Sequence, residues 1–258
     1  MSDTTSNLVR RVEEASLNAW PAMHQILADG WLVRMSNGFT KRANCVVPLY
    51  AGSASSSFGE DSLVLEKIRY CENLFAREQL KTIFRLTSIP NDPALDGLLA
   101  RRGYQQLDLT DVKILNLSVH AQPEPAAAFR LLTLAEWVEH YAVLSDMPVH
   151  ASRLHTTLIR AIRPDCAFAV LEQEDAVVAC ALGVKEQDMV GIFDVITAAN
   201  ARREGYGRTL MNGLLGWGAA QGARIAYLQV AAGNSPAVAL YEGLGFRDLY
   251  HYWYRQTP

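Results

Sequence analysis

A short run of arginines and glycines, between a predicted strand and a predicted helix, has residue types that could bind a charged ligand. Residues 194–210 read as a β-branched strand, a polar loop, two glycines and a leucine-rich helix. Gly205 and Gly207 lack a Cβ, so the main chain can turn tightly and direct N–H groups at an anion beside the positive end of a helix dipole. The charge-assisted donors around this point are Arg202, Arg203 and Arg208. The pattern predicts a site for a di- or polyphosphate.

Two better-known glycine loops do not fit this segment. A dinucleotide-binding fingerprint requires a third glycine inside the helix, and that position is Leu210 here. A Walker A loop requires Gly-Lys followed by Ser or Thr, and no lysine lies near the two glycines. The remaining pattern, Arg-x-x-Gly-x-Gly from Arg202 to Gly207, resembles the pyrophosphate loop of the GNAT superfamily of acyl-CoA-dependent N-acyltransferases.

A second motif lies at the start of the next predicted helix. Asn234 or Ser235 can cap this helix, and Pro236 suits its first turn. The apolar face that follows ends before Gly-Phe and consists of Ala237, Leu240, Tyr241 and Leu244. Together with the glycine loop, this order resembles a complete GNAT domain over residues 129–254.

The resemblance implies a role for each part of the site. Acetyl-CoA would lie between the strand that ends at Thr197 and the strand at residues 225–230, with Asn234 bonding the arm near its thioester. Tyr241 would protonate or hydrogen-bond the departing thiolate. The main chain of Val195, Ile196 and Thr197 would bond the pantetheine arm. The pyrophosphate would lie on Arg202, Arg203, Glu204, Gly205, Tyr206, Gly207 and Arg208.

The chemistry of a phenol supports the role that the resemblance implies for Tyr241. A tyrosine hydroxyl has a pKa of about 10, so it stays protonated at neutral pH and can donate to a thiolate whose conjugate acid has a pKa of about 8.5. By itself, a tyrosine on an apolar helix face favours a packed core residue. The resemblance shifts the interpretation to catalysis.

The sequence offers several candidates for the group that accepts the proton of the amine. An alkyl amine has a pKa of about 10.4, so it must lose a proton before or during attack. Many GNAT members carry a glutamate in one of the two strands beside the cleft, where this chain has Gly191 and Gln229. Strand alternation would turn Asp194 away from the face of Val195. The candidate proton acceptors are Asp194, His150, His155 and a chain of water molecules.

The whole chain has the composition of an ordinary globular protein. It has 258 residues, half of them apolar and a fifth charged, and this length exceeds the usual single domain of about 100 to 150 residues. A formal net charge of -3 argues against nucleic acid or an anionic membrane as the main partner. A polar N-terminus and the lack of a long apolar run predict a cytoplasmic protein without a membrane span. A homodimer is among the oligomeric states left open.

The cysteines show no pattern of a metal site. Cys45, Cys71, Cys166 and Cys180 are far apart, with no C-x-x-C pair and no histidine at metal-ligand spacing. We expect buried, reduced thiols and no metal.

The domain prediction rests on a segment with two prolines at residues 120–127. We expect an N-terminal domain at 1–120, a linker at 121–127 and a catalytic domain at 128–258, forming two GNAT-like α/β halves with mixed sheets. The order strand, helix, Gly-aromatic, strand occurs in both halves, at Gly103-Tyr104 and at Gly245-Phe246. The first half is read either as a degenerate copy, with Leu99 in the place of Tyr241, or as a chance echo.

Local patterns in the first half predict its elements. Residues 8–27 have helical spacing interrupted by Pro21, and residues 62–79 are a further helix. Asn37-Gly38 predicts a two-residue turn between strands at 31–36 and 39–47. A strand at 82–87 is followed by a helix start at residues 91–93, which read Asn-Asp-Pro.

Three functions are compared. The first is an N-acetyltransferase that moves an acetyl group from acetyl-CoA to a primary amine of a small molecule or peptide by direct attack. The second is a non-catalytic sensor of acetyl-CoA, which has little reason to keep both Asn234 and Tyr241. The third is aminoacyl transfer from tRNA, which needs a basic surface that the charge balance does not support.

Overall fold

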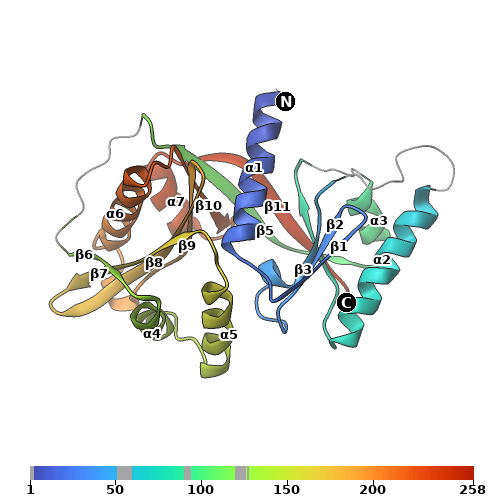
Figure 1. Ribbon diagram of the computed structural model, residues 1–258, viewed down its shortest axis with the longest axis horizontal. Helices are drawn as coiled ribbons and strands as arrows, with labels where there is room; N and C mark the ends of the chain where they lie inside the picture. Colours follow the sequence, from blue (N-terminus) through green and yellow to red (C-terminus); the bar gives the residue numbers. More distant parts are fainter. Residues whose placement is uncertain (1–2, 51–59, 90–93, 120–125, 127) are drawn as a thin grey trace. The chain divides into compact units, whose positions relative to one another are not determined.

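The structure is a computed structural model (Figure 1) that describes residues 3–50, 60–89, 94–119, 126 and 128–258. The chain divides into two compact units: unit 1 comprises residues 1–21 and 111–249, and unit 2 comprises residues 22–110 and 250–258. These units differ from the predicted division at 120–128, because each takes a segment from the other half of the sequence. The predicted linker lies outside the described residues except for residue 126, as does the helix start predicted at 91–93.

Unit 1 contains most of the C-terminal half of the chain. Its elements are α1 (Asp3–Ala19), β6 (Phe129–Leu132), α4 (Leu134–Leu144), α5 (Val149–Arg160), β7 (Asp165–Gln173), β8 (Ala176–Glu186), β9 (Met189–Thr197), α6 (Tyr206–Ala220), β10 (Ile225–Ala231) and α7 (Ser235–Gly243). Two strands, β5 (Gln105–Asn116) and β11 (Arg247–Gln256), each begin in one unit and end in the other. The strand order in unit 1 is β5-β10-β9-β8-β7-β6.

The sheet of unit 1 is mixed. Strands β6, β7, β8 and β9 pair antiparallel in sequence order, whereas β10 pairs parallel to β9 after the crossover helix α6. The acidic turn between β7 and β8 has left-handed φ at Glu174 and Asp175, as a tight two-residue hairpin requires. At the start of α4, Thr133 accepts from the N–H of Glu136, whose side chain bonds back to complete a capping box.

Helices cover both faces of this sheet. Figure 1 shows α6 and α7 on one face and α4 and α5 on the opposite face. The α6 side is an apolar core in which Leu214 lies against Gly183, where an added Cβ would come within 3.0 Å of it. On the other side, Trp137 of α4 is fully buried and donates from Nε1 to the carbonyl of Ala169 at 3.1 Å. The sheet is therefore the middle layer of three.

Helix α1 belongs to unit 1 although it begins the chain. Trp20, just after α1, has its ring centroid 6.0 Å from that of Phe193 on β9 and 5.9 Å from that of His155 on α5. Arg11 forms an ion pair with Asp188, just before β9. The N-terminal helix thus packs on the fold that the sequence assigned to the C-terminal half alone.

Unit 2 contains β1 (His24–Ala28), β2 (Trp31–Met35), β3 (Cys45–Pro48), α2 (Glu60–Arg77), β4 (Ile83–Thr87) and α3 (Leu95–Arg101), with strand order β1-β2-β3-β4-β11. The prediction of helix up to residue 27 is wrong, because β1 forms a hairpin with β2. The turn of this hairpin is Asp29-Gly30, and both residues have left-handed φ. That dipeptide is a strong hairpin signal that the helical spacing concealed.

The two-residue turn predicted at Asn37-Gly38 is confirmed, since both residues have left-handed φ and the N–H of Phe39 donates to the carbonyl of Ser36 at 2.9 Å. Strands β2 and β3 pair antiparallel, but the prediction that the second strand starts at residue 39 is wrong. The second strand begins only at Cys45, because Asn44 holds the connection together as a wider loop. Its Oδ1 accepts from the N–H groups of Ser36 and Gly38 at 2.7 and 3.0 Å, and its Nδ2 donates to the carbonyl of Phe39 at 2.6 Å. The Asn44 side chain thereby bonds main-chain groups beside the turn that would otherwise pair between the strands.

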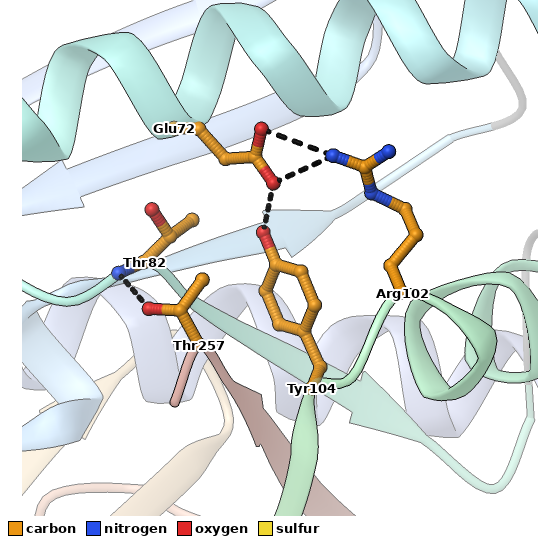
Figure 2. A network of polar contacts seen from close by, with 5 residues as sticks. All are labelled: Glu72, Thr82, Arg102, Tyr104 and Thr257. Atoms are coloured by element: carbon orange, nitrogen blue, oxygen red, sulfur yellow. Dashed lines mark hydrogen bonds and ion pairs between the residues drawn. The ribbon is translucent and has the colours of Figure 1, made fainter.

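Unit 2 repeats the order of elements found in unit 1. Antiparallel strands lead into a parallel pair, β3 and β4, joined by α2, and a helix and a strand follow. The end of β11 pairs antiparallel with β4, and Figure 2 shows Thr82 N–H donating to Thr257 Oγ1 at 3.1 Å. In the same view, Glu72 joins α2 to Arg102 at 3.0 Å and to the hydroxyl of Tyr104 at 2.8 Å. The C-terminal residues therefore complete the sheet of unit 2.

The four cysteines are free thiols, of which Cys45, Cys71 and Cys180 are buried and Cys166 is half-buried. Across the described residues, no cluster of three or more His, Cys, Asp or Glu side chains is placed to hold a metal. None of the helices described here combines the length and apolar character needed to cross a bilayer.

Candidate active site

The two parallel strands β9 and β10 pair over only part of their length. Their pairing runs from Met189 with Ile225 to Ile192 with Leu228. Beyond these pairs β9 continues to Thr197 and β10 to Ala231. The main-chain groups of β9 from Phe193 onward therefore have no partner on β10 within the described pairing. An extended ligand can bond to such an edge as an added strand would.

The glycine loop follows β9 and ends at the N-terminus of α6. Gly205 is the N-cap residue and has φ 84, and Arg203 also has a left-handed φ of 67. The first main-chain bond inside the helix runs from the N–H of Thr209 to the carbonyl of Gly205 at 3.1 Å. The preceding N–H groups of the first turn have no such intrahelical partner, and 15 residues of aligned peptide dipoles lie behind them. This is the geometry of an anion site.

The glycine loop lies close to the end of β9 and to α7. An added Cβ on Gly207 would lie 3.4 Å from Leu240 Cδ2 and 3.5 Å from Thr197 Oγ1. The end of β9, the start of α6 and the middle of α7 thus come into van der Waals contact. The structure thus brings Gly207 of the glycine loop close to Thr197 at the end of β9, and the residue of α7 beside them is Leu240, the chain neighbour of Tyr241.

The arginines of the loop differ in their contacts. Arg202, Arg203 and Glu204 are exposed, and Nε of Arg202 makes a long contact of 3.4 Å to the carbonyl of Thr197. Arg208 was expected beside the pyrophosphate, but its Nη1 donates to the carbonyl of Gly243 at 2.9 Å. That carbonyl is at the C-terminal end of α7, where a cation is favoured by the helix dipole. Arg208 thus joins α6 to α7.

Asn234 caps α7. Its Oδ1 accepts from the N–H of Ala237 at 3.4 Å, and Pro236 occupies the first turn. Capping uses the side-chain oxygen, so the Nδ2 amide group is the part of Asn234 that remains for a ligand. The predicted contact of Asn234 with the thioester arm would have to use that donor.

Tyr241 lies on α7 with a buried ring, 7% exposed, against Phe246 at a centroid distance of 6.1 Å. Its hydroxyl forms no hydrogen bond within the described residues, and it is not fully enclosed. Burial raises the pKa of this hydroxyl to about 12. The phenol is therefore a protonated donor, free to bond a ligand, at any pH at which the protein is expected to work.

The two strand positions where a glutamate was considered hold no titrating group. Gly191 on β9 faces Tyr227 on β10, and a Cβ at Gly191 would lie 2.5 Å from the Tyr227 ring. The tyrosine thus fills the space that a longer side chain on β9 would occupy. The other position is Gln229.

Of the three side chains considered as proton acceptors, two lie in contact with each other. His155 Nε2 lies 2.7 Å from Asp194 Oδ2, and their side chains are only 3% and 8% exposed. His150, at the start of α5, is exposed. The pairing of His155 with Asp194 has no signal in the sequence, since the two residues are on separate elements. Their burial keeps both side chains from bulk solvent.

Alanine substitutions at the two glycines should show which glycine the loop requires for ligand binding. Gly205→Ala places a side chain at φ 84 with open space around it, so only backbone strain opposes it, and we expect acetyl-CoA affinity to fall about tenfold. Gly207→Ala meets ordinary contacts at 3.4 and 3.5 Å, so affinity should change less than about threefold. Titration calorimetry with acetyl-CoA measures both variants. A larger loss for Gly207→Ala would show that the second glycine, not the left-handed turn, controls binding.

The comparisons with known proteins agree with this geometry. The family described as "Probable histone acetyltransferase Rv0428c C-terminal" matches residues 5–255. The chain is 23% identical over 252 residues to "Uncharacterized N-acetyltransferase YobR" of Bacillus subtilis (strain 168), covering 96% of this chain and 98% of the relative. It is 27% identical over 256 residues to "Probable histone acetyltransferase Rv0428c" of Mycobacterium tuberculosis (strain ATCC 25618 / H37Rv), covering 94% and 72% respectively.

A solved structure shows the same fold. The GCN5-related N-acetyltransferase from Kribbella flavida superimposes with a TM-score of 0.71 at 18% identity, covering 96% of this chain and 95% of that one. The family match includes α1, both units and β11, so it extends over the whole arrangement and not only the glycine-loop half. The chain belongs to the Rv0428c C-terminal family of acetyltransferases, and thereby to the GNAT superfamily.

Proposed function

We propose that this acetyltransferase uses acetyl-CoA as donor and a primary amine as acceptor, and that unit 1 holds both. The observation that carries the proposal is the stretch of β9 beyond Ile192, which has no partner on β10 in the described pairing and leads to the first turn of α6, where Gly207 lies close to Leu240 of α7. A pantetheine arm fits an unpaired strand edge, and a diphosphate fits a helix N-terminus with exposed Arg202 and Arg203.

In the proposed reaction the amine nitrogen attacks the thioester carbonyl carbon. The carbonyl oxygen takes up negative charge, then the carbon–sulfur bond breaks and coenzyme A leaves as a thiolate. The amine loses one proton, and the thiolate finally gains one. The product is an amide, and no covalent bond to the protein forms.

The pKa of Tyr241 decides what it does for the thiolate. Complete proton transfer from a phenol with a pKa of about 12 to a thiolate with a pKa of about 8.5 costs about 5 kcal/mol. Donation of a hydrogen bond to the charged sulfur requires no complete proton transfer, so it avoids this free-energy cost. The hydrogen bond stabilises the leaving group as it forms. We therefore assign Tyr241 as a hydrogen-bond donor, with solvent supplying the proton that coenzyme A finally keeps.

We further propose that unit 2 is a repeat of the same fold without a donor site. Leu99 of α3 follows β4 as Tyr241 of α7 follows β10, and Leu99 is fully buried in an apolar core. A leucine cannot bond a thiolate. The sequence at 51–60, before α2, also lacks the Arg-x-x-Gly-x-Gly pattern.

A free-thiol release assay tests the proposed function. Acetyl-CoA is incubated with the full chain and a panel of amines: small amines, polyamines, amino acids and lysine-rich peptides. The peptides are included because one relative is named for histone acetylation. We expect amine-dependent thiol release, with Tyr241→Phe as the matched inactive control. Tight binding of acetyl-CoA without thiol release for any amine would favour the non-catalytic sensor. The lack of a carboxylate at Gly191 and Gln229 also favours that alternative.

A further inference from the structure

Strand β9 contains a bulge just beyond the last pair that it makes with β10. Asp194 and Val195 together face Ala181 of β8, where regular strands place one residue opposite one. Asp194 has φ 52, in the left-handed region. The class of β-bulge with a left-handed first residue usually has glycine there, because a Cβ is strained in that conformation.

The side chain of Asp194 explains why the position is not glycine. Val195 packs on the apolar core beneath α6, whereas Asp194 points to the opposite face of the sheet and bonds His155 of α5 at 2.7 Å. The bulge thus changes which residues of β9 face each side. Because the carboxylate is almost fully buried, leaving it without a partner would be strongly unfavourable.

The imidazole is held in place by aromatic rings on two other elements. His155 stacks on Tyr141 of α4 with centroids 4.7 Å apart, and Trp137 and Trp20 lie 6.1 and 5.9 Å away. Helix α4 and the residue just after α1 therefore both constrain the ring that bonds Asp194. These rings surround His155, which is only 2% exposed.

We propose that His155 and Asp194 are positioning residues that hold the bulge of β9, and through it the main-chain groups of residues 195–197, in the shape that binds the donor. The contact between His155 and Asp194 fixes the left-handed backbone of Asp194 from the face of the sheet opposite α6. The proposal rests on the proposed function, because it assumes that this stretch of β9 bonds the coenzyme arm. It also removes the pair from the candidates for proton acceptor, so water takes the proton of the amine.

Three substitutions of Asp194 distinguish positioning from proton transfer. Asp194→Ala keeps the strain of a left-handed side chain but loses the bond to His155, so acetyl-CoA affinity should fall about 5- to 30-fold. Asp194→Gly also loses the bond but removes the strain, so affinity should return to within about threefold of wild type. Asp194→Asn tolerates the left-handed region and its amide oxygen still accepts from the imidazole, so it should likewise stay within about threefold.

Titration calorimetry with acetyl-CoA, thermal melting and turnover are measured for each variant. If the carboxylate were a base, all three variants would bind acetyl-CoA like wild type and lose turnover together. Equal affinity and equal turnover in all of them would also overturn the proposal. If wild type itself fails to bind acetyl-CoA, the proposed function fails instead, so the two failures are distinguishable.

A double substitution tests whether His155 acts through Asp194. His155→Leu should weaken acetyl-CoA binding like Asp194→Ala, because it leaves a buried carboxylate without this partner. In the Asp194→Gly background, His155→Leu should add less than about a twofold loss, since no carboxylate remains to be held. Independent, additive losses would contradict the positioning role.

Asp175→Ala is the matched control. Asp175 has φ 63 in the turn between β7 and β8, so alanine there carries the same kind of backbone strain outside β9 and the glycine loop. It should lower the melting temperature and leave acetyl-CoA affinity unchanged. A fall in affinity equal to that of Asp194→Ala would mean that the effect is general destabilisation, and would overturn the proposal.

Discussion

Replacing Tyr241 by phenylalanine is expected to lower turnover about 100-fold while changing acetyl-CoA affinity less than about threefold. The ring packs against Phe246 and the core of unit 1, so phenylalanine keeps the packing and loses only the hydroxyl. The hydroxyl bonds the sulfur only when charge develops on it, so its loss affects the transition state more than donor binding. Steady-state thiol release and calorimetry measure the two quantities. Equal losses in turnover and affinity would remove this role.

The pH dependence follows from the raised pKa of Tyr241. Burial raises this pKa to about 12, so the phenol keeps its proton well above the pH at which a free tyrosine loses it. Its contribution to stability is complete below about pH 10 and is lost as pH rises from there through about 12. We therefore expect no decline in turnover from this group between pH 7 and 10.

Tyr104→Phe is the control for loss of a buried tyrosine hydroxyl. Tyr104 donates to Glu72 at 2.8 Å inside unit 2, as Figure 2 shows, and burial raises its pKa above the ordinary value. This variant should lower the melting temperature and leave turnover unchanged. A comparable loss of turnover in both variants would indicate a general effect of stability.

Residues 128–258, expressed alone, are expected not to fold cooperatively. This fragment is the catalytic domain that the sequence predicts, but it lacks α1 and the following Trp20, which lies against Phe193. It also lacks residues 111–116 of β5, which complete the sheet beside β10. It also leaves the end of β11 without β4. The loss of one large buried side chain costs about 2 to 5 kcal/mol, and a whole domain is stable by only about 5 to 15 kcal/mol.

Circular dichroism during thermal melting tests this expectation, with the full chain as reference. Coexpression with residues 1–127 should restore a cooperative melt and acetyl-CoA binding, because it returns both missing segments of unit 1. A cooperative melt of the isolated fragment, together with acetyl-CoA binding at full-chain affinity, would show that the exchanged segments are dispensable.

The sequence alone determined the family resemblance and most of the local elements of unit 1. The glycine loop, the start of α7 at Asn234 and the acidic hairpin turn each depend on residues that are neighbours in the chain. A left-handed turn selects glycine, and a helix N-terminus selects a capping side chain, wherever the rest of the protein lies. Such signals can be read without knowing any long-range contact.

Only the tertiary structure decided the composition of the two units and the surroundings of the site. The pairing of β11 with β4, the packing of Trp20 and the bond between His155 and Asp194 join residues far apart in the chain. Any apolar strand or aromatic ring satisfies the same sequence pattern, so the pattern does not select its partner. Partners are selected by the surface buried and the hydrogen bonds completed over the whole fold. For this reason the sequence predicted Tyr241 and the glycine loop, but not the contacts that hold β9 in shape.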